Sequence, residues 1–219
     1  MIRAQHRFWA DIIFQPYLTW LFKRNFHEIQ LLGTPPKIPD DLPVLLLPNH
    51  STWWDGFFVY LLNKKIFRRT TYLMMLEKQL SKYKFFAKIG AYSIEPENRR
   101  NIIESLEYTV ELLNQEIPLV SVFPQGQLLP WHTRPLGYKR GVEWILRKYG
   151  KPVAVLPLAI RTEFLGEKRP SVFFLFGAVH LFDAGTFQGV DWLEQTESEL
   201  LDDLAFRILH EEKGQNLLD

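Results

Sequence analysis

The chain has 219 residues, of which 47% are hydrophobic and 23% are charged, and its formal net charge is +1. These values are typical of one folded globular domain, exclude an intrinsically disordered chain, and lack the strongly basic balance of a nucleic-acid-binding protein. The absence of cysteine excludes disulfides, thiolate metal sites and a cysteine nucleophile.

The chain opens with an apolar, aromatic-rich segment, FWADIIFQPYLTWLF at residues 8–22. It is too short, and too often interrupted by Asp11, Gln15 and Pro16, to span a bilayer, and we expect the proline to kink or divide the helix. Basic residues flank it on both sides, as in a helix that lies in the plane of a membrane. We therefore expect residues 1–32 to form an amphipathic helical segment that docks on a membrane. Packing against the rest of the chain is the alternative.

Residues 33–219 are predicted to form one α/β domain, because strand patterns alternate with helical patterns. The expected strands are residues 44–48, 70–76, 92–94, 119–123, 152–160 and 171–179, and the expected helices are residues 52–63, 81–91, 98–116, 137–150 and 190–212. The strands are largely apolar, so the expected sheet is mixed, largely buried and flanked by helices.

The small net charge hides an uneven distribution. Between residues 61 and 100 ten basic residues face three acidic ones, whereas from residue 183 to the end ten acidic residues face two basic ones. A basic centre suits an anionic membrane or a phosphate-bearing ligand, and ordinary solvated helix faces are the alternative. No nucleic-acid-binding motif and no cleavable signal peptide are visible. We expect no nucleic-acid partner and a cytoplasmic protein that associates peripherally with the membrane surface.

A strand pattern runs directly into a histidine in VLLLPNHSTWWDG, residues 44–56. His50 and Asp55 would not share a face of one helix, but they can meet if His50 lies on the turn and Asp55 lies in the first turn of the helix. Such a pair beyond a buried strand suits general base catalysis. The alternative is structural: Thr52 caps the helix and Asp55, three residues later, completes a capping box.

Two further stretches follow in chain order: VSVFPQGQLLP at residues 120–130 and VLPLAI at residues 155–160. Together with NHSTWWDG they resemble, in order and spacing, the sequence blocks of the glycerolipid acyltransferase family, the lysophospholipid and glycerophosphate acyltransferases. The resemblance covers roughly residues 44–160. Its most specific part is the histidine and aspartate separated by four residues.

The resemblance implies an enzyme that moves a fatty acyl group from acyl-CoA or acyl carrier protein to a hydroxyl of a membrane lipid acceptor, with no cofactor and no metal. His50 would be the general base and Asp55 would orient its imidazole, without a covalent acyl-enzyme. Main-chain amides near the helix start or the Gly126 turn would stabilise the oxyanion. The expected substrate-binding residues are Asn49, Ser51, Trp53, Trp54, Phe123, Pro124, Gln125, Gly126, Gln127, His132, Arg134 and Lys139.

Two blocks depart from the family pattern. The third block usually reads Phe-Pro-Glu-Gly-Thr-Arg, whereas FPQGQL has Gln125 for the acid, Gln127 for the threonine and Leu128 for the arginine. The second block usually ends Ile-Asp-Arg, whereas GAYSIEP has Pro96 at the arginine position. In the family those two arginines are expected to hold the phosphate of the acceptor.

Two interpretations of the acceptor therefore stay open. The first is a hydroxylated lipid without a phosphomonoester, such as a glycolipid or a glycosylated carotenoid. The second is the usual phosphate-bearing acceptor, held by displaced cations from among Arg99, Arg100, Arg134, Lys139 and Arg140.

Two rival functions also stay open. A thioester hydrolase with the same histidine and aspartate would release the acyl group to water without needing an acceptor. A catalytically silent homologue, suggested by the altered third block, would bind a lipid or an acyl carrier without turnover.

Overall fold

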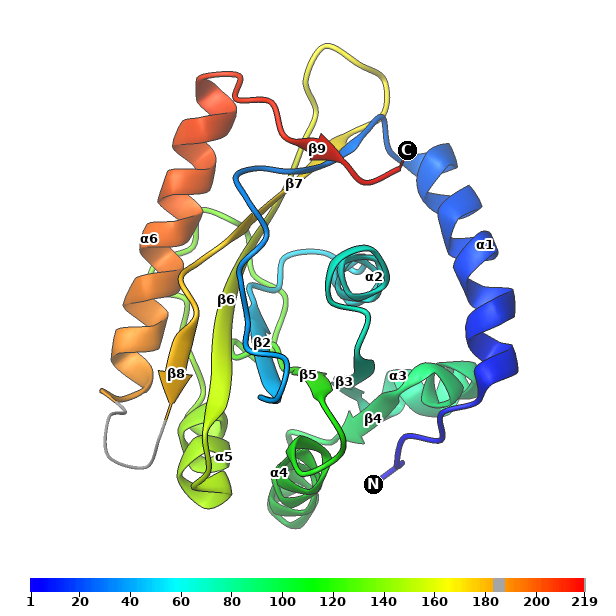
Figure 1. Cartoon of the computed structure of the whole chain (residues 1–219), viewed down its shortest axis with the longest axis vertical. Coiled ribbons are helices and arrows are strands. Elements are labelled where there is room, and N and C mark those ends of the chain that lie inside the picture. The colour runs from blue at the N-terminus through cyan, green and yellow to red at the C-terminus, as the bar shows by residue number, and fades with distance from the viewer. Residues whose placement is uncertain (183–187, 219) are drawn as a thin grey trace.

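The computed structural model describes residues 1–182 and 188–218, which fold into an α/β domain built on one mixed sheet (Figure 1). In this part of the chain the sheet has nine strands, in the order β4-β3-β5-β2-β6-β7-β1-β9 with β8 paired to β6. The strands are β1 (Ile29–Leu31), β2 (Val44–Pro48), β3 (Thr70–Leu76), β4 (Ala91–Ile94), β5 (Pro118–Ser121), β6 (Val153–Glu163), β7 (Ser171–Phe176), β8 (His180–Phe182) and β9 (Gln215–Asn216).

Five neighbouring strands, β4, β3, β5, β2 and β6, run parallel to one another. Their carboxyl ends therefore meet at one edge of the sheet, which is where open α/β sheets bind ligands. β7 and β8 run antiparallel to β6, so the sheet is mixed, as predicted. All five residues of β2 are buried, which accounts for the unbroken apolar sequence of this central strand.

The helices cover the two faces of the sheet in separate sets. One face packs against α4, α5 and α6, and the opposite face packs against α1 and α2 (Figure 1). The helices are α1 (Phe8–Asn25), α2 (Asp55–Leu62), α3 (Glu77–Lys82), α4 (Arg99–Leu113), α5 (Gly141–Tyr149) and α6 (Val190–Leu209), with a π-helical turn η1 (Asn63–Phe67) after α2 and a 3₁₀ helix η2 (Lys84–Ile89) after α3.

Pro16 was expected to kink or divide the first helix, and it does not divide it, because α1 runs as one helix from Phe8 to Asn25. Phe14 before the proline packs on Tyr60, and Phe22 after it stacks on Phe58, so both halves of α1 are held by α2. This packing compensates for the hydrogen bond that proline removes.

Three short elements were not expected. β1 lies within residues 1–32 and pairs with β7, so the sheet begins before residue 33. The strand expected at 171–179 ends at Phe176 and is followed by the separate strand β8, and β9 pairs with β1 near the end of the chain. The helix expected at 81–91 is the end of α3 followed by η2. Strands of two or three residues are too short to show an alternating pattern.

Pro157 lies inside β6, where a proline would normally remove a ladder hydrogen bond. Residues 153–155 of β6 pair with β8 and residues 158–163 pair with β7. The proline stands between these segments, where one neighbouring strand replaces the other, and its carbonyl accepts a hydrogen bond from Gly177 N at 3.0 Å. At this position the missing N–H costs the sheet little.

Candidate active site

His50 lies two residues beyond β2, at the edge where the carboxyl ends of the parallel strands meet. Its Nδ1 lies 2.8 Å from Oδ2 of Asp55, the first residue of α2. A carboxylate only accepts hydrogen bonds, so Nδ1 carries the proton and Nε2 keeps a free lone pair. The Asp55 side chain is 1% exposed and the His50 side chain is 24% exposed, so the imidazole reaches solvent from a shielded pair.

The Asp55 carboxylate also holds the turn that carries His50. Its Oδ2 accepts hydrogen bonds from Ser51 N at 2.7 Å and Thr52 N at 2.9 Å, and its Oδ1 accepts one from Thr52 Oγ1 at 2.5 Å. α2 begins at Asp55 rather than after Thr52, whose Oγ1 accepts a hydrogen bond from Trp54 N at 3.2 Å. The structural role and the pairing with His50 therefore belong to one carboxylate and do not exclude each other.

The loop of the third block holds the backbone of His50 on both sides. Gln125, which is 1% exposed, accepts a hydrogen bond from His50 N through Oε1, and Leu129 N donates to His50 O at 2.9 Å. The Phe123 ring stacks on the imidazole with the ring centroids 4.1 Å apart. The role of Gln125 as a backbone anchor was not evident from the sequence, because its partner lies 75 residues away.

Asn49 and Ser51 point into the protein framework. Asn49 is buried and exchanges two hydrogen bonds with the backbone of Ile160, at 2.7 and 3.1 Å, which joins the end of β2 to β6. Asn49 Nδ2 also donates to Ser51 Oγ at 3.2 Å. These contacts position the His50 turn and leave Asn49 with a structural task.

The two tryptophans have different surroundings. Trp54 packs edge-on against Phe26 and lies beside Phe22, so it belongs to the contact between α2 and α1. Trp53 is 55% exposed and touches Phe57 with the ring centroids 4.8 Å apart. Of the pair, Trp53 is the one available to a ligand.

The turn at Gly126 is exposed, together with Gln127 and Leu128. Gly126 has a φ of +68°, which favours glycine, and its N–H donates to Phe123 O at 3.1 Å. Lys139 N donates to the carbonyl of the buried Pro124 at 2.8 Å, and a Cβ on Gly126 would lie 3.5 Å from Lys139 Cγ. The structure therefore brings Lys139 to the third-block turn.

The loop after the third block is fastened to α6. Arg134 pairs with Asp202 at 2.7 Å and also donates to the carbonyls of Trp131 and Thr133. Arg134 is thus committed to loop structure, and His132 is exposed beside it.

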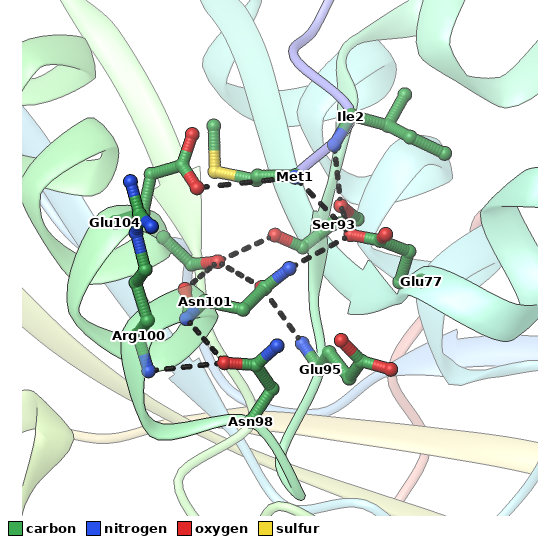
Figure 2. Close-up of polar contacts among 10 residues, drawn as sticks. Met1, Ile2, Glu77, Ser93, Glu95, Asn98, Arg100, Asn101 and Glu104 are labelled. Atoms are coloured by element: carbon green, nitrogen blue, oxygen red, sulfur yellow. Dashed lines mark hydrogen bonds and ion pairs between the residues drawn. The ribbon is translucent and has the colours of Figure 1, made fainter.

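The second block ends in a polar network beyond β3 and β4 (Figure 2). Ser93 Oγ and Asn101 Nδ2 donate to Glu77 at 2.7 and 3.1 Å, and these hydrogen bonds lower the pKa of Glu77. Asn101 Oδ1 accepts a hydrogen bond from Glu95 N at 3.1 Å. Figure 2 shows the Arg100 side chain on the far side of α4 from Glu95, so the structure does not bring Arg100 to the end of this block.

The sequence reasoning did not single out Glu197 of α6. This residue is fully buried, and it lies on the same face of α6 as Leu193, Leu201 and Leu204. A signal was present, because an acid at position 197 interrupts an otherwise apolar stripe at helical spacing.

Among the described residues, no group of three or more His, Cys, Asp or Glu side chains is arranged to hold a metal ion.

The Acyltransferase family model matches residues 31–161, more than half of the chain, and the matched range includes His50 and the third block. No curated protein sequence matches the chain. The fold is similar to the crystal structure of the 1-acyl-sn-glycerophosphate (LPA) acyltransferase PlsC from Thermotoga maritima, with a TM-score of 0.59 and 18% identity over 90% of this chain and 78% of that chain.

Proposed function

Because the chain belongs to the acyltransferase family, we propose that it transfers a fatty acyl group from acyl-CoA or acyl carrier protein to a hydroxyl of a membrane lipid. The observation that carries the mechanism is the 2.8 Å contact between His50 Nδ1 and Asp55 Oδ2 at the carboxyl edge of the sheet. It makes Nδ1 the donor to the carboxylate, so the ring nitrogen that the neutral imidazole offers as a base is Nε2, on the side away from Asp55.

In the proposed reaction, His50 Nε2 takes the proton of the acceptor hydroxyl while the hydroxyl oxygen attacks the thioester carbonyl. Asp55 stabilises the imidazolium that forms. The tetrahedral intermediate then expels the thiolate, which takes the proton from Nε2 and leaves as a thiol. The N–H groups of Ser51 and Thr52 already bind Asp55, and Gly126 N–H already binds Phe123 O, so the N–H groups of Gln127 and Leu128 on the Gly126 turn are the better candidates for binding the oxyanion.

The acyl chain is proposed to occupy an apolar pocket of about 440 Å³ between α1 and η2. The pocket is lined by Ile13, Phe14, Tyr17, Lys82, Tyr83, Lys84, Phe85 and Phe86. Phe57 contacts Phe14 and Phe86 of this lining on one side and Trp53 on the other. This row of rings links the His50 turn to the pocket, which is the path that an acyl chain attached at the reacting carbonyl requires.

We propose that α1 lies on the membrane surface. Its outward face exposes aromatic and aliphatic side chains, namely Phe8, Trp9, Ile12, Ile13, Tyr17 and Trp20. Lys88 lies over the Trp9 ring at 4.9 Å and Arg24 over the Trp20 ring at 5.5 Å, so cations border the apolar face as an anionic lipid surface favours. No helix in the described part of the chain is long and apolar enough to cross a bilayer.

The acceptor is proposed to lack a phosphomonoester. Pro96 and Leu128 replace the two arginines of the family pattern, and Arg134 is engaged by Asp202. A phosphate-bearing acceptor is the second candidate, and the position of Lys139 beside Gly126 favours it.

The mechanism is tested with purified protein, an acyl-CoA donor and a panel of hydroxylated lipids that includes lysophosphatidic acid and a glycolipid. We expect His50→Ala to abolish acyl transfer and the exposed-histidine control His210→Ala to retain it. Full transfer by His50→Ala would refute the role of His50. Thiol release that does not depend on any acceptor would indicate a hydrolase, and lipid binding without turnover would indicate a silent homologue.

The same panel tests the acceptor. If Lys139→Gln weakens transfer to lysophosphatidic acid and leaves transfer to the glycolipid unchanged, a phosphate is bound at the Gly126 turn. If lysophosphatidic acid is not used at all, the acceptor without a phosphomonoester is supported.

Membrane docking is tested by cosedimentation with vesicles of anionic or zwitterionic lipids. The double variant Ile12→Glu with Ile13→Glu is expected to lose binding to anionic vesicles. The matched control is the double variant Phe206→Glu with Leu209→Glu, which adds the same two charges at exposed apolar positions of α6. Equal loss in both variants would contradict a specific role of α1.

A further inference from the structure

Two carboxyl groups are fully buried in the described part of the chain, Asp55 on α2 and Glu197 on α6. They approach the His50 turn from opposite faces of the sheet. Asp55 accepts four hydrogen bonds. Neither oxygen of Glu197 has a hydrogen-bond partner among the described residues. A buried carboxyl without partners is rare enough to require a reason.

Glu197 lies beneath the residue that precedes His50. The backbone N–H groups of Asn49 and Leu158 act on the Glu197 carboxyl, although neither completes a hydrogen bond with it. Asn49 N instead donates to Leu158 O at 3.3 Å, a long contact at the end of β2. Only one peptide unit separates Asn49, on which Glu197 borders, from His50.

Tyr138 lies near the Glu197 carboxyl from the loop that follows the third block. Its hydroxyl is buried and has no partner among the residues described. Burial raises the pKa of Tyr138, and Glu197 and Glu194 raise it further when they carry a charge, so these groups lie close enough to interact. Glu194 fixes the loop by accepting hydrogen bonds from Gly137 N at 2.9 Å and Tyr138 N at 3.0 Å.

These surroundings favour the neutral acid. An ionised carboxylate loses its hydration on burial and here gains no hydrogen bond in return. Burial therefore raises the pKa of Glu197 well above its usual value, while the nearby N–H groups and the charge of Arg134 oppose the rise. The neutral acid packs with the apolar stripe of α6 formed by Val190, Leu193, Leu201 and Leu204.

We propose that Glu197 is a positioning residue for the His50 turn: as a neutral acid it packs beneath Asn49, and its ionisation disrupts this packing and displaces the base. The inference rests on the proposed function, because His50 acts as the base there. Glu197 itself touches no substrate and acts only through the backbone of the turn.

The groups around Glu197 determine how it responds to pH. Tyr138 and Arg134 face it from the loop, and Glu194 lies one turn earlier on α6. Among the residues that the structure describes, Arg134 is the one cation that acts on it, and Asp202 already holds that cation at 2.7 Å. His180 of β8 contacts α6 at Trp192, more than one turn before Glu197. In the described part of the chain, no group near Glu197 is therefore a free cation that would stabilise its charged form.

The protonation state is tested first by infrared spectroscopy of the full chain at neutral pH. A protonated carboxyl group has a carbonyl stretching band that carboxylates lack. We expect the wild type to show such a band, Glu197→Gln to remove it, and the control Glu199→Gln on the exposed side of α6 to retain it. If Glu197→Gln does not fold, Glu197→Met supplies the same comparison.

The positioning role is tested by the pH dependence of kcat for acyl transfer. Glu197→Gln is expected to match the wild type within about twofold at neutral pH and to keep its activity at alkaline pH, where the wild type loses activity reversibly. Tyr138→Phe separates a contribution from the tyrosine, and it should leave the alkaline loss in place. Identical alkaline profiles for the wild type and Glu197→Gln would overturn the positioning role.

The two proposals fail in different ways. A wild type without the protonated band overturns the inference about Glu197 whatever the activity is. A wild type that shows the band and transfers no acyl group overturns the proposed function, and leaves the neutral state of Glu197 supported.

Discussion

Asp55 and Glu197 are buried to the same extent beside the same turn, and their polar surroundings are opposite. Asp55 receives two backbone N–H groups, a hydroxyl and an imidazole N–H. Glu197 receives no hydrogen bond from the described residues. Hydrogen bonds to the charged form favour that form, whereas burial without them favours the neutral form.

The difference separates two ways of holding one base. Asp55 holds the turn through hydrogen bonds, each of which has a defined geometry. These bonds set both the tautomer and the orientation of His50. Glu197 supports the turn by packing beneath Asn49, an interaction without a preferred direction. Variants of the two residues should therefore differ in activity, in stability and in response to pH.

The largest effect is expected on kcat, from substitution of Asp55. Asp55→Asn keeps the shape of the side chain but removes the charge that stabilises the imidazolium, so kcat should fall by about 10²–10⁴-fold. Steady-state acyl transfer measures this. Asp191→Asn, the same change in the exposed first turn of α6, is the control and should be silent. A loss of only a few-fold in Asp55→Asn would argue against the dyad.

The second prediction contrasts the two sites in stability. Asp55→Ala leaves buried N–H groups of the turn without acceptors and should lower the free energy of unfolding by roughly 2–4 kcal/mol. Glu197→Leu replaces an unpartnered acid by an apolar side chain of similar volume and should be neutral or stabilising by about 1 kcal/mol at pH 7. Urea denaturation compares them. Equal destabilisation would mean that Glu197 makes strong polar contacts.

The third prediction concerns pH. Because burial raises the folded-state pKa of Glu197, its stabilising contribution is complete below the unfolded pKa of about 4.3 and is lost as the pH rises through the folded pKa. The wild type should lose about 1.4 kcal/mol per pH unit relative to Glu197→Gln over that range. Denaturation at a series of pH values tests this, and Glu199→Gln should run parallel to the wild type.

The fourth prediction concerns Gln125 of the third block, which accepts a hydrogen bond from His50 N. Gln125→Leu leaves His50 N without its acceptor and should lower kcat by about tenfold, in line with the cost of one unsatisfied buried N–H. Gln125→Glu restores the acid of the family pattern and keeps an acceptor, so it should retain most of the activity. If the leucine variant is fully active, the loop does not position the base.

The smallest effect is expected from substitution of Glu194, which holds the loop at Gly137 and Tyr138. Glu194→Gln keeps one acceptor oxygen for the N–H groups of Gly137 and Tyr138, so it should cost about 1 kcal/mol of stability. Glu199→Gln removes the same charge from the same helix and should have no measurable effect. Thermal unfolding of the two variants side by side makes the comparison.

The sequence predicted the elements whose signals are local. The helix expected at residues 98–116 is α4, Arg99–Leu113, and Asn98 caps it by accepting hydrogen bonds from Arg100 N and Asn101 N. The sheet class and the meeting of His50 with Asp55 followed from a buried strand that runs into a helix start. Each of these depends on residues only a few positions apart.

The parts that could not be predicted depend on distant partners. Gln125 was expected at the substrate, and its acceptor oxygen serves His50 N, 75 residues away. Arg134 was considered as a phosphate ligand and is held by Asp202, 68 residues away. Pattern and propensity describe neighbours in sequence, whereas the use of a polar side chain is decided by what tertiary packing brings to it.

The two backbone anchors of His50 have an evolutionary consequence. Gln125 and Leu129 fix the position of the His50 backbone, and the three positions between them face solvent. Gly126 is constrained by its φ of +68°, so mutation at residues 127 and 128 is what can change the surface around the base without moving the base. A library restricted to those two codons would sample new acceptors at little risk to the chemistry, and it offers a short route by which an enzyme of this architecture can diversify.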